Sequence, residues 1–166
     1  IGLRKRKKKM NIQIFSARMA AKELKSSPNK WHVVSIRGIR HTPTVHPLDF
    51  VEDSPKDMII VRFDDISWST DPSLGYSPPK REDVEKIFNW VDEKEPENLM
   101  VHCWAGISRS SAIAFLLSCK YEQDTKALLN PDRHKPNVIV MDYGLDILNN
   151  TVASKLYRDF ILSQSP

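Results

Sequence analysis

The sequence predicts an α/β fold, in which helices flank a mainly parallel central sheet of about four to five strands. Short apolar runs of strand length alternate along the chain with longer stretches whose apolar residues recur at helical spacing. Strands that are separated by helices pair in parallel, because each connection must cross back over the sheet before the next strand begins. The order of the elements therefore indicates a layered α/β domain.

Four runs are predicted to be strands. Residues 11–15 alternate polar and apolar side chains, which is typical of a half-buried strand. Residues 32–36 are largely apolar, as in parallel strands that are covered on both faces. The other two strands are expected at 58–63 and 98–101.

The stretches between the strands are predicted to be helices. Ser16 is a suitable N-cap for a helix that ends near Lys25, before the breaker Pro28. Residues 80–93 carry apolar side chains at helical spacing and predict an amphipathic helix. Further helices are expected over 112–121, 124–129, 138–148 and 152–162, and loops over 37–47 and 67–79.

The composition predicts an ordinary globular domain. The chain has 166 residues, of which 40% are hydrophobic and 28% are charged. No apolar run approaches the roughly 18 residues that a membrane span needs, so no membrane partner is expected. Two cysteines, Cys103 and Cys119, are too few for a disulfide framework.

The net charge of +4 comes from one short segment. Residues 1–9 form a basic leader in which positions 4–9 are all Arg or Lys, and the chain from Met10 onward is slightly acidic. The leader is expected to be either a nuclear-import or anionic-surface segment or a disordered addition that is foreign to the natural protein. Residues 10–166 are predicted to form a single domain, and this folded domain is not expected to bind nucleic acid.

One stretch combines the features of a phosphate-binding loop. Cys103 follows the last predicted strand, Arg109 comes six residues later, and a helical pattern begins directly after it. Backbone N–H groups of a tight loop and the positive end of a helix attract a phosphate group, and a guanidinium grips two of its oxygens. The same field favours the thiolate of Cys103, which is a nucleophile, and Gly106 lets the backbone curl around the ligand.

Three of the predicted loops are expected to meet at one edge of the sheet. Ligands of parallel α/β sheets bind at the carboxyl ends of the strands. The loops that follow strands there comprise residues 37–47, 64–79 and 103–109. The sequence therefore predicts that they form a common site.

A carboxylic acid is predicted in the second of these loops. When a phosphoester is cleaved, the leaving oxygen needs a proton, and a carboxylic acid held over the loop is the natural donor. We predict that Asp65 is this acid, because Asp64, next to Phe63, has the place of a strand-end or turn residue. Asp64 and Asp71 stay open as alternatives, and so does the interpretation of the adjacent pair as turn and capping carboxylates.

The residues around Cys103 resemble a known signature. His102-Cys103, five further residues and Arg109-Ser110 resemble the motif of the cysteine-dependent protein tyrosine and dual-specificity phosphatase superfamily. The match is strongest over 63–137 and looks most similar to compact, bacterial-type members. It implies a dual-specificity-phosphatase-like fold and a phosphatase-like catalytic domain at 10–166. The sequence lacks the Trp-Pro-Asp loop of the classical receptor-type enzymes, which puts strict tyrosine specificity in doubt.

The resemblance also implies a mechanism and a role for each motif residue. Cys103 takes the phosphoryl group as a phosphocysteine, water then releases phosphate, and no metal or cofactor is implied. Ser110 matches the hydroxyl that helps the thiolate leave, and His102 matches the histidine that organises the loop. Charge on the phosphate oxygens is expected to be stabilised by Arg109 and by the loop residues Trp104, Ala105, Gly106, Ile107 and Ser108.

The expected function is hydrolysis of phosphomonoesters, at phosphotyrosine and also at phosphoserine or phosphothreonine of protein substrates. The main alternative is a phosphate-binding module, a pseudophosphatase, that recognises phosphorylated partners with little turnover. A weaker alternative is a phosphatase of small phosphomonoesters or of RNA 5′-phosphates. A reactive free thiol favours a reducing compartment, so we expect a cytoplasmic protein, or a nuclear one if the leader is native.

Overall fold

The central sheet has four strands in the part of the chain that the structure describes. The structure is a computed structural model that describes residues 9–40 and 42–164, so most of the predicted leader lies outside the described residues. The spatial order is β1-β4-β2-β3, and every neighbouring pair is parallel. The prediction of an α/β fold with a parallel sheet is confirmed. The strands are β1 (Asn11–Ser16), β2 (His32–Arg37), β3 (Asp57–Arg62) and β4 (Asn98–Cys103).

The helices occupy the predicted positions. They are α1 (Ala17–Ser26), α2 (Arg81–Lys94), α3 (Arg109–Lys120), α4 (Thr125–Leu128), α5 (Val138–Leu148) and α6 (Thr151–Ser163). Two 3₁₀ turns were not predicted: η1 (Pro47–Phe50) begins at the last residue of the predicted loop 37–47, and η2 (Pro72–Leu74) lies inside the predicted loop 67–79. Both begin with a proline, and the preceding side chains of His46 and Asp71 accept hydrogen bonds from the first turn. No helix in the described part of the chain is both long and apolar enough to span a membrane.

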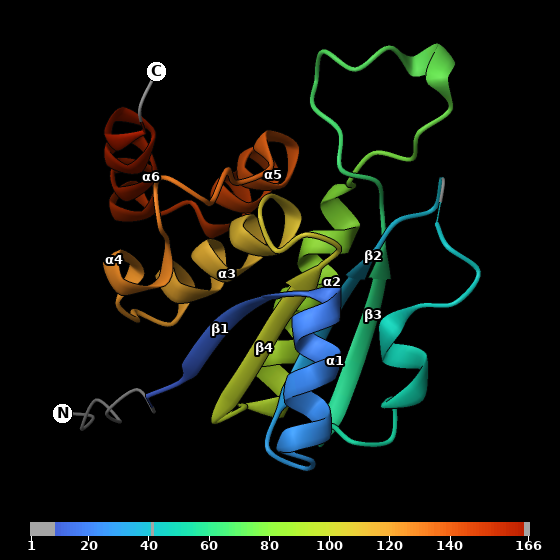
Figure 1. The fold of residues 1–166 in the computed structure, drawn as a ribbon. Coiled ribbons are helices and arrows are strands. Elements are labelled where there is room, and N and C mark those ends of the chain that lie inside the picture. Colours follow the sequence, from blue (N-terminus) through green and yellow to red (C-terminus); the bar gives the residue numbers. More distant parts are fainter. Residues whose placement is uncertain (1–8, 41, 165–166) are drawn as a thin grey trace, which may run out of the picture.

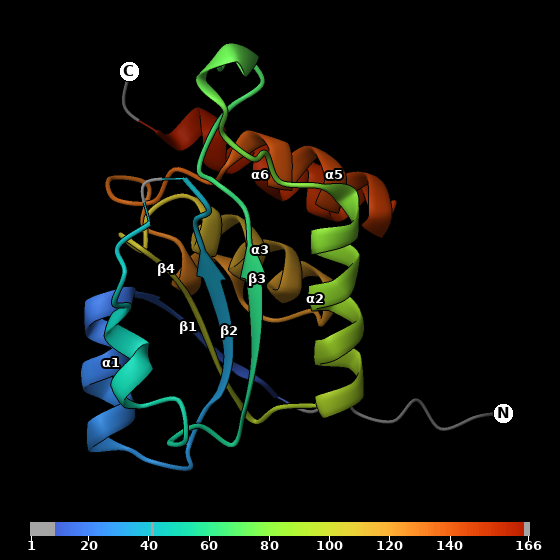
Figure 2. The same ribbon diagram turned by 90° about the vertical axis from the view of Figure 1, so that its right-hand side faces the viewer.

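Helices cover both faces of the sheet. Figures 1 and 2 show α1 and η1 on one face and α2 and α3 on the other, with α5 packed against α2 and α3 and α6 packed against α5. Ser16 begins α1 as predicted, since its hydroxyl oxygen accepts the N–H of Met19 at 3.2 Å. Because all strands run the same way, their carboxyl ends and the loops that follow them lie at one edge of the sheet.

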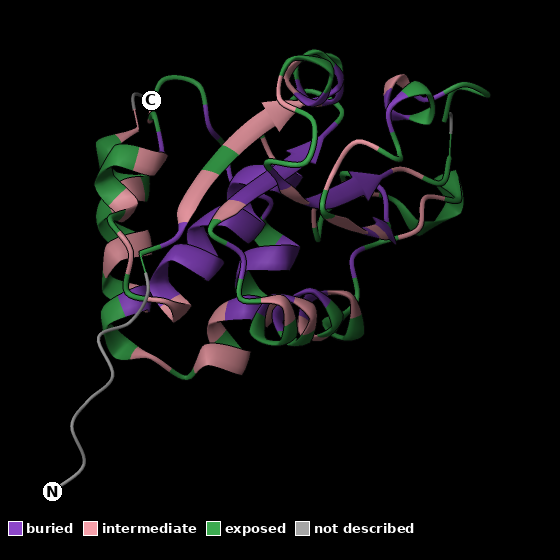
Figure 3. Cartoon of the chain, turned by 90° about the horizontal axis from the view of Figure 1, so that it is seen from below, coloured by how far each residue is buried: buried purple, intermediate pink, exposed green. Residues whose placement is uncertain are grey.

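The alternation of side chains along the central strands divides the core between the two faces. Val33 of β2 and Met100 of β4 pack with Leu24 of α1, whereas Val34 and Val101 belong to the larger cluster with α2, α3 and α5. Figure 3 shows the buried residues concentrated in the central strands and the exposed ones on the outer helices and loops. A rigid sheet that is covered on both faces therefore supports the loop edge.

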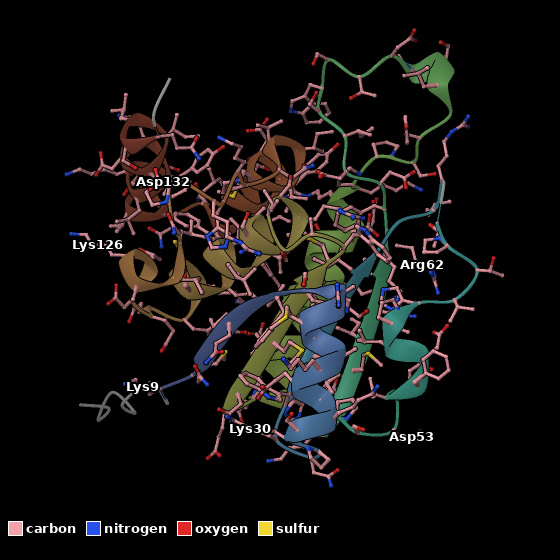
Figure 4. All side chains as sticks on the ribbon, in the orientation of Figure 1. Lys9, Lys30, Asp53, Arg62, Lys126 and Asp132 are labelled. Atoms are coloured by element: carbon pink, nitrogen blue, oxygen red, sulfur yellow. The ribbon has the colours of Figure 1, made fainter. Side chains whose placement is uncertain are left out.

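The two ends of the sheet can be told apart in Figure 4. Arg62, the last residue of β3, is labelled near the loop edge, whereas Lys30 and Asp53 are labelled at the opposite, amino end of the strands. The register places Ser35 of β2 directly beside His102 of β4. This pairing brings Ser35 next to His102, the residue before Cys103.

Candidate active site

A cavity of about 490 Å³ lies at the carboxyl ends of the strands. All three predicted loops contribute to its wall, so the prediction that they meet is confirmed. The lining residues are Ile36, Arg37, Gly38, Arg40, Thr42, Pro43, His46, Asp64, Asp65, Tyr76, Trp104 and Arg109. A second hollow, of about 590 Å³, lies along β1 and α4, and no residue of the 103–109 loop lines it.

Cys103 is the last residue of β4 and is buried. Its Sγ lies 3.1 Å from the hydroxyl oxygen of Ser110, in the first turn of α3. The backbone N–H of Gly106 donates to the same sulfur at 3.3 Å. The strand, the loop and the helix N-terminus thus converge on one sulfur atom, as the sequence predicts.

Gly106 is required where the loop passes close to β1. Its φ is +71°, in the left-handed region that side chains rarely adopt. A Cβ at this position would lie 2.8 Å from both the carbonyl carbon of Phe15 and the backbone nitrogen of Ser16. Because both of these atoms belong to the backbone, neither can turn aside as the end of a flexible side chain could.

Arg109 is the first residue of α3 and is 8% exposed. Its Nη1 donates to the carbonyl oxygen of Phe63 at 2.9 Å, which ties the guanidinium to the segment before the predicted acid. Among the residues that the structure describes, its Nε is the buried side-chain nitrogen or oxygen without a hydrogen-bond partner. Burying an N–H without a hydrogen-bond partner costs free energy, so we expect this donor to bind an acceptor such as an oxyanion.

His102 is completely buried and joined to β2. Arg37 Nε donates to Ser35 Oγ at 2.9 Å, and the Ser35 hydroxyl then donates to His102 Nε2 at 2.7 Å. The other ring nitrogen, Nδ1, lies 3.1 Å from the carbonyl oxygen of Cys103 and carries the proton, because a carbonyl only accepts. Burial lowers the pKa of His102 to about 3, so the ring is neutral and orients the backbone at Cys103.

Asp65 is exposed and lies over the loop that follows Cys103. Its Oδ1 accepts two hydrogen bonds, from Ser108 Oγ at 2.8 Å and from Asn137 Nδ2 at 2.9 Å. The loop after β3 is therefore joined to the loop after β4 through this carboxylate.

The two alternative carboxylates are engaged elsewhere. Asp64 is buried and accepts the backbone N–H groups of Ile39 at 2.8 Å, Arg40 at 3.1 Å and Ser77 at 2.8 Å. Burial acts to raise the pKa of Asp64, but these hydrogen bonds and the nearby Arg109 guanidinium outweigh it and hold the pKa below its ordinary value. Asp71 caps η2 by accepting the N–H of Ser73 and does not line the cavity.

Asn137 is a site residue that the sequence interpretation missed. It is buried and caps α5, with its Oδ1 accepting the N–H groups of Ile139 and Val140 at 3.1 Å each. Its Nδ2 reaches Asp65, and its backbone N–H donates to the carbonyl oxygen of Ser108 at 3.1 Å. The pair Pro136-Asn137 before an apolar helix indicates a helix start, but nothing local indicates which residue the free side-chain N–H will meet.

The other predicted residues are distributed as follows. Trp104 is 53% exposed and lines the cavity, with its ring 6.2 Å from that of His46. Ala105, Ile107 and Ser108 complete the turn but are not part of the cavity wall. Cys119 is buried near the far end of α3. In the described part of the chain, no three His, Cys, Asp or Glu side chains gather as a metal site requires.

The comparisons with known proteins concern the fold. No protein-family model matches the sequence, and no curated protein matches it. Tk-PTP in its active form is 12% identical, with 90% of this chain and 88% of that chain covered and a TM-score of 0.45. A candidate phosphatase (DUF442) from Shewanella putrefaciens CN-32 is 20% identical, with 93% and 87% covered and a TM-score of 0.47. The PTP-2 phosphatase of Cydia pomonella is 16% identical, with 82% and 74% covered and a TM-score of 0.42. These structures are similar to this chain in the path of the backbone, at low sequence identity.

Proposed function

We propose that this protein is a cysteine-dependent phosphatase that hydrolyses phosphomonoesters through a phosphocysteine intermediate. The observation that carries the proposal is the buried, unpartnered Nε of Arg109, at the helix start that also brings the Ser110 hydroxyl to the sulfur of Cys103. A donor of this kind next to a nucleophile is suited to the oxygens of a bound phosphate. The residue types agree with the resemblance to the tyrosine and dual-specificity phosphatase superfamily.

In the first step, the Cys103 thiolate attacks phosphorus and the bond to the ester oxygen breaks. The S–P bond forms, the leaving oxygen takes the electron pair and a proton from Asp65, and Arg109 with the loop N–H groups holds the equatorial oxygens. Both hydrogen bonds to Asp65 end on Oδ1, so the transferable proton belongs on Oδ2. This assignment makes Asn137 and Ser108 the groups that orient the acid.

In the second step, a water molecule attacks the phosphocysteine. The Asp65 carboxylate takes a proton from this water, the S–P bond breaks, and the thiolate leaves with phosphate as the product. Ser110 donates its O–H to the sulfur as negative charge returns to it, for which its oxygen is already 3.1 Å away. We expect phosphorylated proteins, at tyrosine and at serine or threonine, to be the substrates.

Hydrolysis of aryl phosphates between about pH 5 and pH 8 tests the proposal. Wild type should turn over with a bell-shaped profile, Cys103→Ser should be inactive, and Asp65→Asn should lose about 100-fold or more with phenyl phosphate. Asp71→Asn is the matched control, because it changes an exposed aspartate of the same loop and keeps an acceptor for Ser73. Binding of vanadate without any turnover would support the phosphate-binding module instead, and activity that survives Cys103→Ser would overturn the proposal.

A further inference from the structure

The loop that carries Asp65 is long and is held at its base. Residues 64–79, here named the acid loop, connect β3 to the segment before α2, and Figure 1 shows them projecting above the loop edge beside α5. The base is closed in both directions, since Asp64 N–H donates to Ser77 O at 2.7 Å and Ser77 N–H donates to Asp64 Oδ2 at 2.8 Å. These two hydrogen bonds fix the position of the base of the acid loop, but not the distance between the rest of the loop and the cavity.

A second attachment lies just after the acid. Trp68, three residues beyond Asp65, is 57% exposed, and its Nε1–H nevertheless donates to Asp142 Oδ2 at 2.7 Å. Its ring also packs edge-on against Tyr143 with the centroids 5.7 Å apart. Both partners belong to α5, so a mostly solvent-exposed indole makes a directed contact with a helix 74 residues away.

Asp65 is itself held against α5, and Trp68 adds a second contact with the same helix. Asn137, the N-cap of α5, donates to Asp65 Oδ1 and to the carbonyl oxygen of Ile66, each at 2.9 Å. Three residues beyond Asp65, Trp68 rests on Asp142 and Tyr143, farther along α5. If the Trp68 contact breaks, the contact of Asn137 is left to hold this part of the acid loop against α5.

We propose that Trp68, Asp142 and Tyr143 form a latch that seats the acid loop on α5, and that Trp68 and Asp142 are positioning residues for Asp65. The inference rests on the proposed function, in which Asp65 protonates the leaving oxygen. When the latch is open, Asp65 spends a smaller share of the time within reach of that oxygen. Cys103 and Arg109 are held by other contacts, so phosphate binding and nucleophilic attack remain intact.

This division of labour has a kinetic signature. A poor leaving group such as phenoxide needs the proton, whereas a strongly activated one such as a dinitrophenoxide departs without it. Removing one directed hydrogen bond with Trp68→Phe should lower kcat/KM with phenyl phosphate roughly three- to tenfold. Trp68→Ala, which also loses the ring contact, should lower it further, and Asp142→Asn, which keeps an acceptor oxygen, should lower it least. With the activated ester, kcat/KM of all three variants should stay close to wild type, because kcat/KM reports the steps through formation of the phosphocysteine and not the second step, in which Asp65 activates water. The inhibition constant of vanadate should not change.

Two matched variants control for general effects on α5 and on tryptophan content. Asp146, farther along α5, pairs with Arg81 and not with the acid loop, so Asp146→Asn should behave as wild type with both esters. Trp90→Phe makes the same change on α2, where the ring contacts His32. If the Trp68 variants lower kcat/KM of both esters equally, or of neither, the latch is wrong.

Asp65→Asn separates the failure of the latch from the failure of the proposed function. If Asp65→Asn lowers kcat/KM with phenyl phosphate only, and Trp68→Ala lowers it with neither ester, the latch is wrong and Asp65 is still the acid. If Asp65→Asn lowers kcat/KM of the two esters equally, the assignment of Asp65 as the acid is wrong, and so is the latch.

Discussion

Ser110 holds its hydroxyl oxygen 3.1 Å from the sulfur of Cys103, and both side chains are buried where β4 gives way to α3. The contact joins the last residue of a strand to the first turn of a helix across a tight loop. Because the hydroxyl can donate to sulfur, the proposed mechanism gives it its main role in the second step, in which negative charge returns to the sulfur.

Ser110→Ala should therefore slow the breakdown of the phosphocysteine more than its formation. We expect kcat to fall about ten- to a hundredfold, which corresponds to losing a hydrogen bond to a charged group. Rapid mixing with an aryl phosphate should then show a burst of the leaving alcohol, and acid quenching should trap phosphate on the protein.

Ser118→Ala is the matched control for this experiment. Ser118 lies on the same helix, and its hydroxyl donates to the carbonyl oxygen of Phe115 at 2.7 Å. A burst in both variants, or in neither, would contradict the role given to Ser110.

Asn137 should separate stability from activity. Asn137→Ala loses both the helix cap and the donor to Asp65, so the free energy of unfolding should fall by about 1 kcal/mol and activity should fall as well. Asn137→Asp keeps an oxygen that caps α5 but turns a second carboxylate toward Asp65 Oδ1, which is 2.9 Å from Nδ2 in the native protein. Denaturant unfolding should thus find Asn137→Asp more stable than Asn137→Ala, while its turnover of phenyl phosphate is no better. Equal stability of the two variants would argue against the cap, and full activity of Asn137→Asp against the contact with the acid.

Gly106→Ala should disrupt the loop after Cys103. The alanine would have to adopt a φ of +71°, and its Cβ would lie 2.8 Å from backbone atoms of Phe15 and Ser16. The left-handed conformation and the overlap together should cost about 2–4 kcal/mol of unfolding free energy and weaken vanadate binding. Gly38→Ala is the comparison for stability, since its Cβ would meet a side-chain atom of Asp64 at 3.2 Å and no backbone. A smaller loss for Gly106→Ala than for Gly38→Ala would contradict this account.

The buried histidines predict a loss of stability in mild acid. Burial lowers the pKa of His46 to about 4 and that of His102 to about 3, from an ordinary value of 6.5 in the unfolded chain. Below pH 6.5 each ring binds a proton in the unfolded state but not in the folded state. As the pH falls toward the folded pKa, each ring therefore lowers the free energy of unfolding by about 1.4 kcal/mol per pH unit. Urea unfolding at several pH values should show this slope.

His46→Asn tests the origin of that slope. The amide cannot titrate, but its oxygen can still cap η1 by accepting the N–H of Leu48, as Nδ1 does at 3.0 Å. Between pH 6.5 and 4, the free energy of unfolding of the variant should change less steeply with pH, by the contribution of about one proton. Above pH 7 its slope should equal that of wild type. An unchanged slope below pH 6.5 would show that His46 does not contribute.

Local patterns were sufficient for the elements and for the centre of the site. The helices and strands follow from the spacing of apolar residues, as in α2, where Val84, Ile87, Phe88 and Val91 are all buried. The segment from Cys103 to Ser110 was predictable because its chemistry is contained in one strand, one loop and one helix start. Asp64 is also predicted to be a strand-end or turn residue, and its carboxylate accepts the backbone N–H groups of Ile39, Arg40 and Ser77.

Only the tertiary structure decided what holds these residues in place. His102, Asp65 and Trp68 have partners 67, 72 and 74 residues away, in β2, at the N-cap of α5 and in α5. Such contacts depend on the strand order β1-β4-β2-β3 and on how α5 packs against α2 and α3. Apolar periodicity determines which face of an element is buried, but many packings bury the same face. The choice of polar partner is made when the layers assemble, and for that reason the sequence alone predicted Cys103 as the nucleophile and Asp65 as the acid, but not the contact of Asn137 with Asp65.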